Sequence, residues 1–184
     1  MTVDWVHELN EQLRDEWDRH LRPGLEGLSD EEYLWEPVAG CWSIRPRAEA
    51  RSPMAAGGGD VVADFAYPEP SPPPVTTIAW RMGHVSVGVL GMRASNHFGD
   101  GALTYQNADW QLTAAGGLAM LDAAYEAWTT PLRALGEADL ARPCGPAEGE
   151  WSAFSFGALV LHISREVIHH GAEMLLLRDL YRSR

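Results

Sequence analysis

The longest segment with a helical pattern runs from Ser155 to Tyr181 and reads SFGALVLHISREVIHHGAEMLLLRDLY. Apolar residues recur in it at steps of three and four, which is typical of an amphipathic helix. One face of this helix carries Leu159, Ile163, Glu166, His170, Glu173, Leu177 and Leu180. The face is apolar at both ends and ionisable at three consecutive positions in its middle, where an unpaired buried carboxylate would cost several kcal/mol. The long helix therefore carries a candidate polar site.

Three further segments have helical periodicity and cover about residues 3–21, 76–97 and 113–135. Proline and glycine follow the first, glycine follows the third, and threonines that suit a helix N-cap precede the second. A short acidic helical turn is expected at 29–34, where a serine followed three residues later by glutamate indicates a capping box. Because we find no convincing strand alternation and no internal repeat, four long helices predict an all-α helical bundle.

The connection between the first and second long helices is unusually long. Residues 36–75 have little periodicity and are rich in proline, glycine and alanine, with five prolines between Pro68 and Pro74. A loop of this length is usually functional or disordered, and we expect a mixture of the two. The part from Arg45 to Val75 lacks a periodic apolar face, so we expect it to contribute little to global stability.

Composition indicates an ordinary globular domain. The chain has 184 residues, of which 46% are hydrophobic and 22% charged, so we expect a single domain over 1–184. The formal net charge is −12, and all 14 basic residues are arginines scattered along the chain. A nucleic-acid interface or an anionic membrane surface would need a concentrated basic face, so we expect neither partner.

The cysteines and the apolar runs bear on the cellular compartment. Cys41 and Cys144 are far apart and show no CxxC spacing, so we expect two free thiols, as is usual in the reducing cytosol. No run of about 18 apolar residues occurs, and no basic segment followed by an apolar run opens the chain. These features predict a cytoplasmic protein.

The ionisable middle of the last helix is a candidate metal site. Residues four apart lie on one helix face with Cβ atoms about 6 Å apart, so Glu166 and His170 can reach one ion. His162 and His170 are about 12 Å apart along the helix axis, too far to share an ion. Glu166 paired with His162, His169 or His170 therefore remains possible, and His84, on the apolar second helix, is the best third ligand. A hydrogen-bonded core histidine and a solvated helix face are the alternative interpretations of these residues.

Two segments resemble the metal-binding helices of the DinB-like superfamily: TTIAWRMGH at Thr76–His84 and LHISREVIHHGAE at Leu161–Glu173. The resemblance implies a four-helix bundle with up-down-down-up topology, often dimeric, whose metal is held by one histidine of the second helix and a pair on the last. In many members that pair is His-x-x-x-His, and here Glu166 stands in the place of the first histidine. A His, Glu, His set resembles that of the mycothiol-dependent maleylpyruvate isomerases in the same superfamily.

The resemblance selects His84, Glu166 and His170 as the metal ligands. It leaves His162, His169 and Glu173 as residues of the second shell or as alternative ligands. The ion implied is divalent, with Zn²⁺ first and Ni²⁺ second. A homodimer is also expected from the resemblance.

The implied function is that of an enzyme that uses a low-molecular-weight thiol such as mycothiol. A divalent metal would hold the thiol as a thiolate for attack on a small electrophile, in an S-transferase or isomerase reaction. Trp42, Trp80 and Trp151 could wall an apolar pocket, and no catalytic side chain is identified. The alternatives are a non-catalytic, stress-associated metal-binding protein and a metal-dependent hydrolase.

Overall fold

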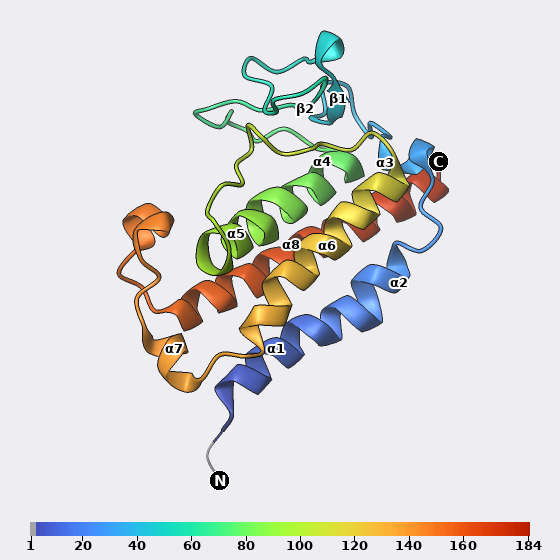
Figure 1. The fold of residues 1–184 in the computed structure, drawn as a ribbon. Helices are drawn as coiled ribbons and strands as arrows, with labels where there is room; N and C mark the ends of the chain where they lie inside the picture. The colour runs from blue at the N-terminus through green and yellow to red at the C-terminus, as the bar shows by residue number, and fades with distance from the viewer. Residues whose placement is uncertain (1–2) are drawn as a thin grey trace.

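The computed structural model describes residues 3–184 and is mostly helical, as the sequence predicts (Figure 1). The first helical segment consists of α1 (Trp5–Glu16), the π-helical turn η1 (Trp17–Leu21) and α2 (Arg22–Gly24). The Asp4 side chain caps its N-terminus by accepting a hydrogen bond from the His7 amide. The segment passes through Pro23 and ends three residues later than predicted, because proline is tolerated in the first turn of α2.

The second helical segment confirms the range predicted for it but not its regularity. It consists of α4 (Ile78–Gly83), η3 (His84–Gly91) and α5 (Met92–Phe98), and the Thr77 side chain caps it. The middle part, η3, is a π-helix, a rare conformation found frequently at functional sites. His84 is its first residue.

The last two long helices begin at the positions predicted for them. Thr113 caps α6 (Ala114–Leu132), and Ser155 caps α8 (Phe156–Arg182). Between them lie the short helix α7 (Glu137–Ala141) and the 3-10 helix η4 (Pro146–Trp151). The capping box predicted after the first segment is also present, at the start of α3 (Asp30–Tyr33).

The long helical segments pack around one hydrophobic core, whose largest fully buried side chains include Trp128, Tyr33 and Phe156. In Figure 1, α1 and α8 run toward the end of the molecule where the C-terminus lies, whereas α4–α5 and α6 run the other way. The segment α4–η3 lies between α6 and α8 and contacts both. Within residues 3–184 no helix is both long enough and apolar enough to cross a membrane.

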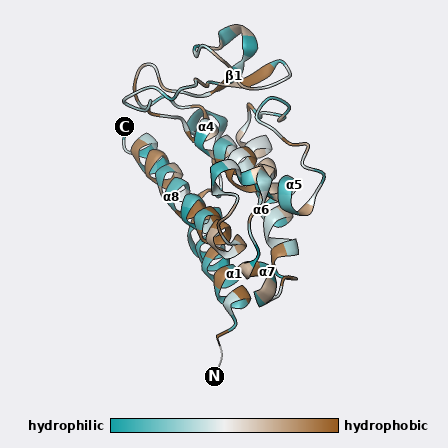
Figure 2. Cartoon of the chain, turned by 90° about the vertical axis from the view of Figure 1, so that its left-hand side faces the viewer, coloured by the Kyte–Doolittle hydropathy of each residue, from teal (hydrophilic) through white to brown (hydrophobic). Residues whose placement is uncertain are grey.

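The face of α8 that packs into the core differs from the face identified in the sequence analysis. Hydrophobic and hydrophilic residues alternate along the helix (Figure 2), and its buried residues include Ile163, Val167 and Met174. Glu166 and Glu173 flank this buried strip with side chains 28% and 35% exposed. Only His170, among the three ionisable positions, is buried. The two carboxylates therefore lie at the border of the core rather than at its centre, where desolvation costs less.

The long connection contains a small sheet that the sequence analysis missed. Strand β1 (Ile44–Pro46) pairs antiparallel with β2 (Val61–Ala63), with Ile44 opposite Ala63, and η2 (Arg47–Glu49) lies between them. Strands of three residues are too short to show the alternation from which strands are predicted. The expectation of a long irregular loop therefore holds for only part of the connection.

Buried Asp64 ties this connection together. Its carboxylate accepts hydrogen bonds from the Ser43 amide at 3.0 Å, from Arg45 Nε at 2.8 Å and from the Arg51 amide at 3.0 Å. Arg45 also lies 2.7 Å from Glu36. This network gives the connection buried interactions of its own. The expectation that residues 45–75 contribute little to stability did not include such interactions.

Candidate metal centre

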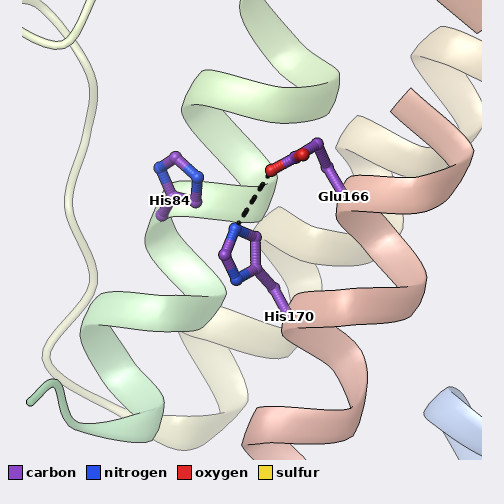
Figure 3. Close-up of side chains that lie close together, drawn as sticks. All are labelled: His84, Glu166 and His170. Carbon is purple, nitrogen blue, oxygen red and sulfur yellow. Dashed lines mark ion pairs between the residues drawn. The ribbon is translucent and has the colours of Figure 1, made fainter. Parts of the chain in front are cut away.

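The structure brings His84, Glu166 and His170 together, with one donor atom of each within 4.8 Å of the other two (Figure 3). His84 opens η3, while Glu166 and His170 lie one turn apart on α8. The imidazole rings of the two histidines meet edge to face at a centroid distance of 4.8 Å. His170 Nε2 lies 3.3 Å from Glu166 Oε2. Both helices thus contribute side chains to one cluster.

The His84 ring is held on two sides. Its Nδ1 is hydrogen-bonded to the Tyr105 hydroxyl at 2.7 Å, and Trp80 stacks on it at 5.4 Å with 10° between the ring planes. Tyr105 can approach the helix because residue 88 is glycine, where a Cβ atom would collide with the tyrosine hydroxyl. The hydrogen bond at Nδ1 leaves Nε2 of His84 as the nitrogen available to a ligand.

His170 is oriented by a neighbouring carboxylate. Its Nδ1 donates a hydrogen bond to Glu173 Oε2 at 2.8 Å, and the same oxygen lies 2.9 Å from Arg81 Nε. A neutral His170 with its proton on Nδ1 presents the lone pair of Nε2 to Glu166 Oε2. Two acceptors that face each other at 3.3 Å repel unless a cation lies between them.

Burial disfavours the charged form of both histidines. Burial, and secondly the charge that His170 would carry, lower the pKa of His84 to about 3. Burial also lowers the pKa of His170, against the hydrogen bond to Glu173, which raises it. Because both imidazoles resist protonation, a metal ion is a better candidate than a proton for the space between His170 and Glu166.

The donor set fits a divalent metal. Ligand atoms about 2.1 Å from a tetrahedral Zn²⁺ are roughly 3.4 Å apart, close to the 3.3 Å between His170 Nε2 and Glu166 Oε2. Two neutral imidazoles and one carboxylate suit Zn²⁺ or Ni²⁺. Three protein ligands would also leave room for a further ligand.

Comparison with known families identifies the superfamily of the chain. The family model of the DinB superfamily matches residues 10–174, which include all three residues of the cluster. The chain belongs to the DinB superfamily. Neither the curated proteins nor the solved structures contain a significant match.

The DinB match does not choose between the cluster and a second group on α8. His169, His170 and Glu173 also have donor atoms within 4.8 Å of one another. However, His169 is exposed, and all three residues belong to one helix. Glu173 is already engaged by His170 and Arg81. The cluster that joins η3 to α8 is therefore the stronger candidate, and it is the set of ligands that the family resemblance implies.

The residues predicted around the ligands lie close to them. Glu173 bonds to His170, and His169 Nε2 lies 3.4 Å from Glu173 Oε1. His162 Nδ1 lies 3.7 Å from Glu166 Oε1 but accepts its hydrogen bond from Arg165 Nη2 at 3.1 Å. His162 is thus near Glu166 without a hydrogen bond to it.

The three tryptophans expected to wall one pocket are divided between two places. Trp80 stacks on His84, and Trp42 contacts Trp80 at a centroid distance of 5.6 Å. Trp151 instead lines a cavity with Phe154, and neither of the other two tryptophans lines that cavity. The expectation of a common pocket is wrong for Trp151, because η4 places it beside the first turns of α8.

Sequence reasoning missed Tyr105 and Arg81. Tyr105 lies in the polar connection between α5 and α6, where nothing in the local pattern distinguishes it from a surface tyrosine. Arg81 is three residues before His84 on the same helix, and its contact with Glu173 depends on how α4 packs against α8. Only a long-range contact could have identified either residue.

Proposed function

We propose that this DinB protein is a metal-dependent enzyme that activates a low-molecular-weight thiol, such as mycothiol, for attack on a small electrophile in an S-transferase or isomerase reaction. The observation that carries the proposal is the pair of facing acceptors, His170 Nε2 and Glu166 Oε2, beside the neutral imidazole of His84. The helix directions in Figure 1 are in keeping with an up-down-down-up four-helix bundle, which is part of the same proposal.

In this proposal the residues of the cluster bind the ion, and two neighbouring residues orient the ligands. His84, Glu166 and His170 hold the ion, Tyr105 orients His84, and Glu173 orients His170. When bound, a divalent ion of the zinc type supplies Lewis acidity that keeps a thiol deprotonated near neutral pH. Residues that position the imidazoles before the ion arrives reduce the reorganisation needed on binding.

An external thiol is favoured because the protein's own thiols are poor nucleophiles. Cys41 and Cys144 are both buried and free, and burial raises the pKa of each thiol. A buried thiol with a raised pKa stays protonated at neutral pH and is inert. The sulfur nucleophile would therefore come from a cosubstrate.

The test begins with metal content. His84→Ala, Glu166→Ala and His170→Ala should each lose the bound metal that wild type retains, as measured by elemental analysis of purified protein. His169→Ala is the matched control, because this exposed neighbour of His170 lies outside the cluster, and it should keep the metal. Stoichiometric metal in all three cluster variants would refute the ligand assignment.

The thiol is tested on protein loaded with Co²⁺. Thiolate coordination gives an intense near-ultraviolet charge-transfer band, which titration with mycothiol should produce in wild type and not in His170→Ala. If millimolar mycothiol, bacillithiol and glutathione all fail to produce the band while the metal is retained, the protein is a non-catalytic metal-binding protein or a hydrolase instead.

A further inference from the structure

A cavity of about 540 Å³ lies between α5, η4 and the first turns of α8. Its volume falls within the range typical of small-molecule sites. The walls that bear on its chemistry are formed by Trp151, Phe154, Leu161, Arg93, Arg165 and His162. The three proposed metal ligands do not line it.

One side of the cavity is apolar and exposed. Trp151, Phe154 and Leu161 are 57%, 52% and 49% exposed, although large apolar side chains are usually buried. Trp151 and Phe154 meet edge to face at a centroid distance of 5.3 Å. Several large hydrophobic residues gathered at a hollow mark a binding surface, because a ligand that covers them removes apolar area from water.

The other side of the cavity is basic. Arg93 and Arg165 both line it, and the only acidic side chain in its walls is that of Glu148. Glu148 is already engaged, with His97 Nε2 at 3.0 Å and Arg93 Nη2 at 3.5 Å. Two arginines and one glutamate give the walls a formal charge of +1, in a chain whose net charge is −12. This positive charge of the walls favours a ligand with one negative charge. The planar guanidinium group of arginine matches the geometry of a carboxylate.

The cavity is next to the candidate metal centre. His162 lines the cavity, and its Nδ1 lies 3.7 Å from Glu166 Oε1. A molecule in contact with His162 would therefore be separated from the cluster by a single side chain.

We propose that this cavity binds a small aromatic carboxylate, with its ring against Trp151 and Phe154 and its carboxylate on Arg165 and Arg93. The binding site stands without the metal. Its use as the site of the electrophile rests on the proposed function.

The test is isothermal titration calorimetry of metal-free protein with 2-naphthoate, alongside the neutral 2-naphthamide. Naphthoate should bind one to one and at least about tenfold more tightly than naphthamide, because the amide lacks the charge that the arginines recognise. Arg165→Gln should abolish this preference for the acid. Arg19→Gln is the matched control, since it removes an exposed arginine of η1, outside the cavity walls, and it should leave the preference intact.

The aromatic side of the cavity has its own control pair. Trp151→Ala should weaken naphthoate binding at least about tenfold, whereas Trp5→Ala, which removes an equally exposed tryptophan on α1, should not. Equal binding of acid and amide, or equal effects of the two tryptophan variants, would overturn the proposal. Naphthoate binding that survives in His84→Ala would support the cavity site even if the metal assignment failed.

Discussion

At the scale of single residues, the centre depends on a contact between His84 and a loop. The Tyr105 hydroxyl bonds to His84 Nδ1 at 2.7 Å, in a space that exists because residue 88 has no side chain. A partner at Nδ1 fixes both the orientation of the ring and the nitrogen left for a metal. Tyr105 is thus a positioning residue for the proposed site.

Tyr105→Phe should weaken metal affinity by about ten- to a hundredfold, as loss of an outer partner of a ligating histidine commonly does. Competition with a zinc-selective indicator measures this affinity without reference to any activity. Tyr67→Phe removes a hydroxyl from an exposed tyrosine and should leave the affinity unchanged. Equal affinity in wild type and Tyr105→Phe would show that the hydrogen bond does not orient the ligand.

His84 should also make the metal-free protein sensitive to acid. Its pKa is about 3 in the folded chain, against an ordinary value near 6.5, so only the unfolded state takes up this proton as the pH falls between these values. The contribution to stability is present above pH 6.5 and is lost progressively below it.

Between pH 8 and pH 5, metal-free wild type should therefore lose roughly 2 kcal/mol more of its free energy of unfolding than His84→Gln does. Urea unfolding at a series of pH values measures the difference. His20→Gln, at an exposed position, should follow wild type. Parallel pH profiles for wild type and His84→Gln would contradict the prediction.

At the scale of elements, the connection between the first two long helical segments is held by a buried ion pair. Asp64 is completely buried, and Arg45, with a side chain 8% exposed, lies 2.8 Å from it. The Asp64 carbonyl oxygen also accepts a hydrogen bond from Trp80 Nε1 at 2.7 Å, so the connection supports the tryptophan that stacks on His84.

Asp64→Ala should lower the free energy of unfolding by about 3 kcal/mol, because it leaves the buried Arg45 with Glu36 as its one charged partner. Urea unfolding measures the loss, and limited proteolysis should cut the variant first within residues 45–75. Asp60→Ala changes an exposed aspartate of the same connection and should stay within about 0.5 kcal/mol of wild type. If Asp64→Ala lowers the free energy of unfolding no more than Asp60→Ala does, the connection contributes little to stability.

At the scale of the whole molecule, the proposed ion joins two parts of the chain that are far apart in sequence. His84 belongs to the second helical segment, and the other two proposed ligands, Glu166 and His170, belong to α8. An ion that binds only the folded chain stabilises it by mass action. At a free metal concentration about a hundred times Kd, the gain is about 2.7 kcal/mol.

Chelation should therefore lower the Tm of wild type by roughly 5–10 °C for a chain of this length. Differential scanning calorimetry with and without a chelator measures the shift. His170→Ala should show none, whereas His169→Ala should behave as wild type. If the chelator removes the metal but the Tm stays unchanged, the ion does not stabilise the fold by linking the two segments.

Local sequence patterns predicted the helices and the four-residue spacing of Glu166 and His170 on one face of α8. The caps at Thr77, Thr113 and Ser155 act over three residues, and the spacing of Glu166 and His170 lies within one helix, so both are local properties that a linear pattern records. The limits of the helices were accordingly predicted within a few residues.

The surroundings of Glu166 and His170 depend instead on tertiary contacts. The contact of Tyr105 with His84, the burial of Asp64 and the placing of Trp151 in a separate cavity all join residues distant in sequence. Periodicity reports which face of a helix is buried, but not which side chain of another segment meets it. The site consists of such long-range contacts, which depend on how the helices and their connections pack in three dimensions.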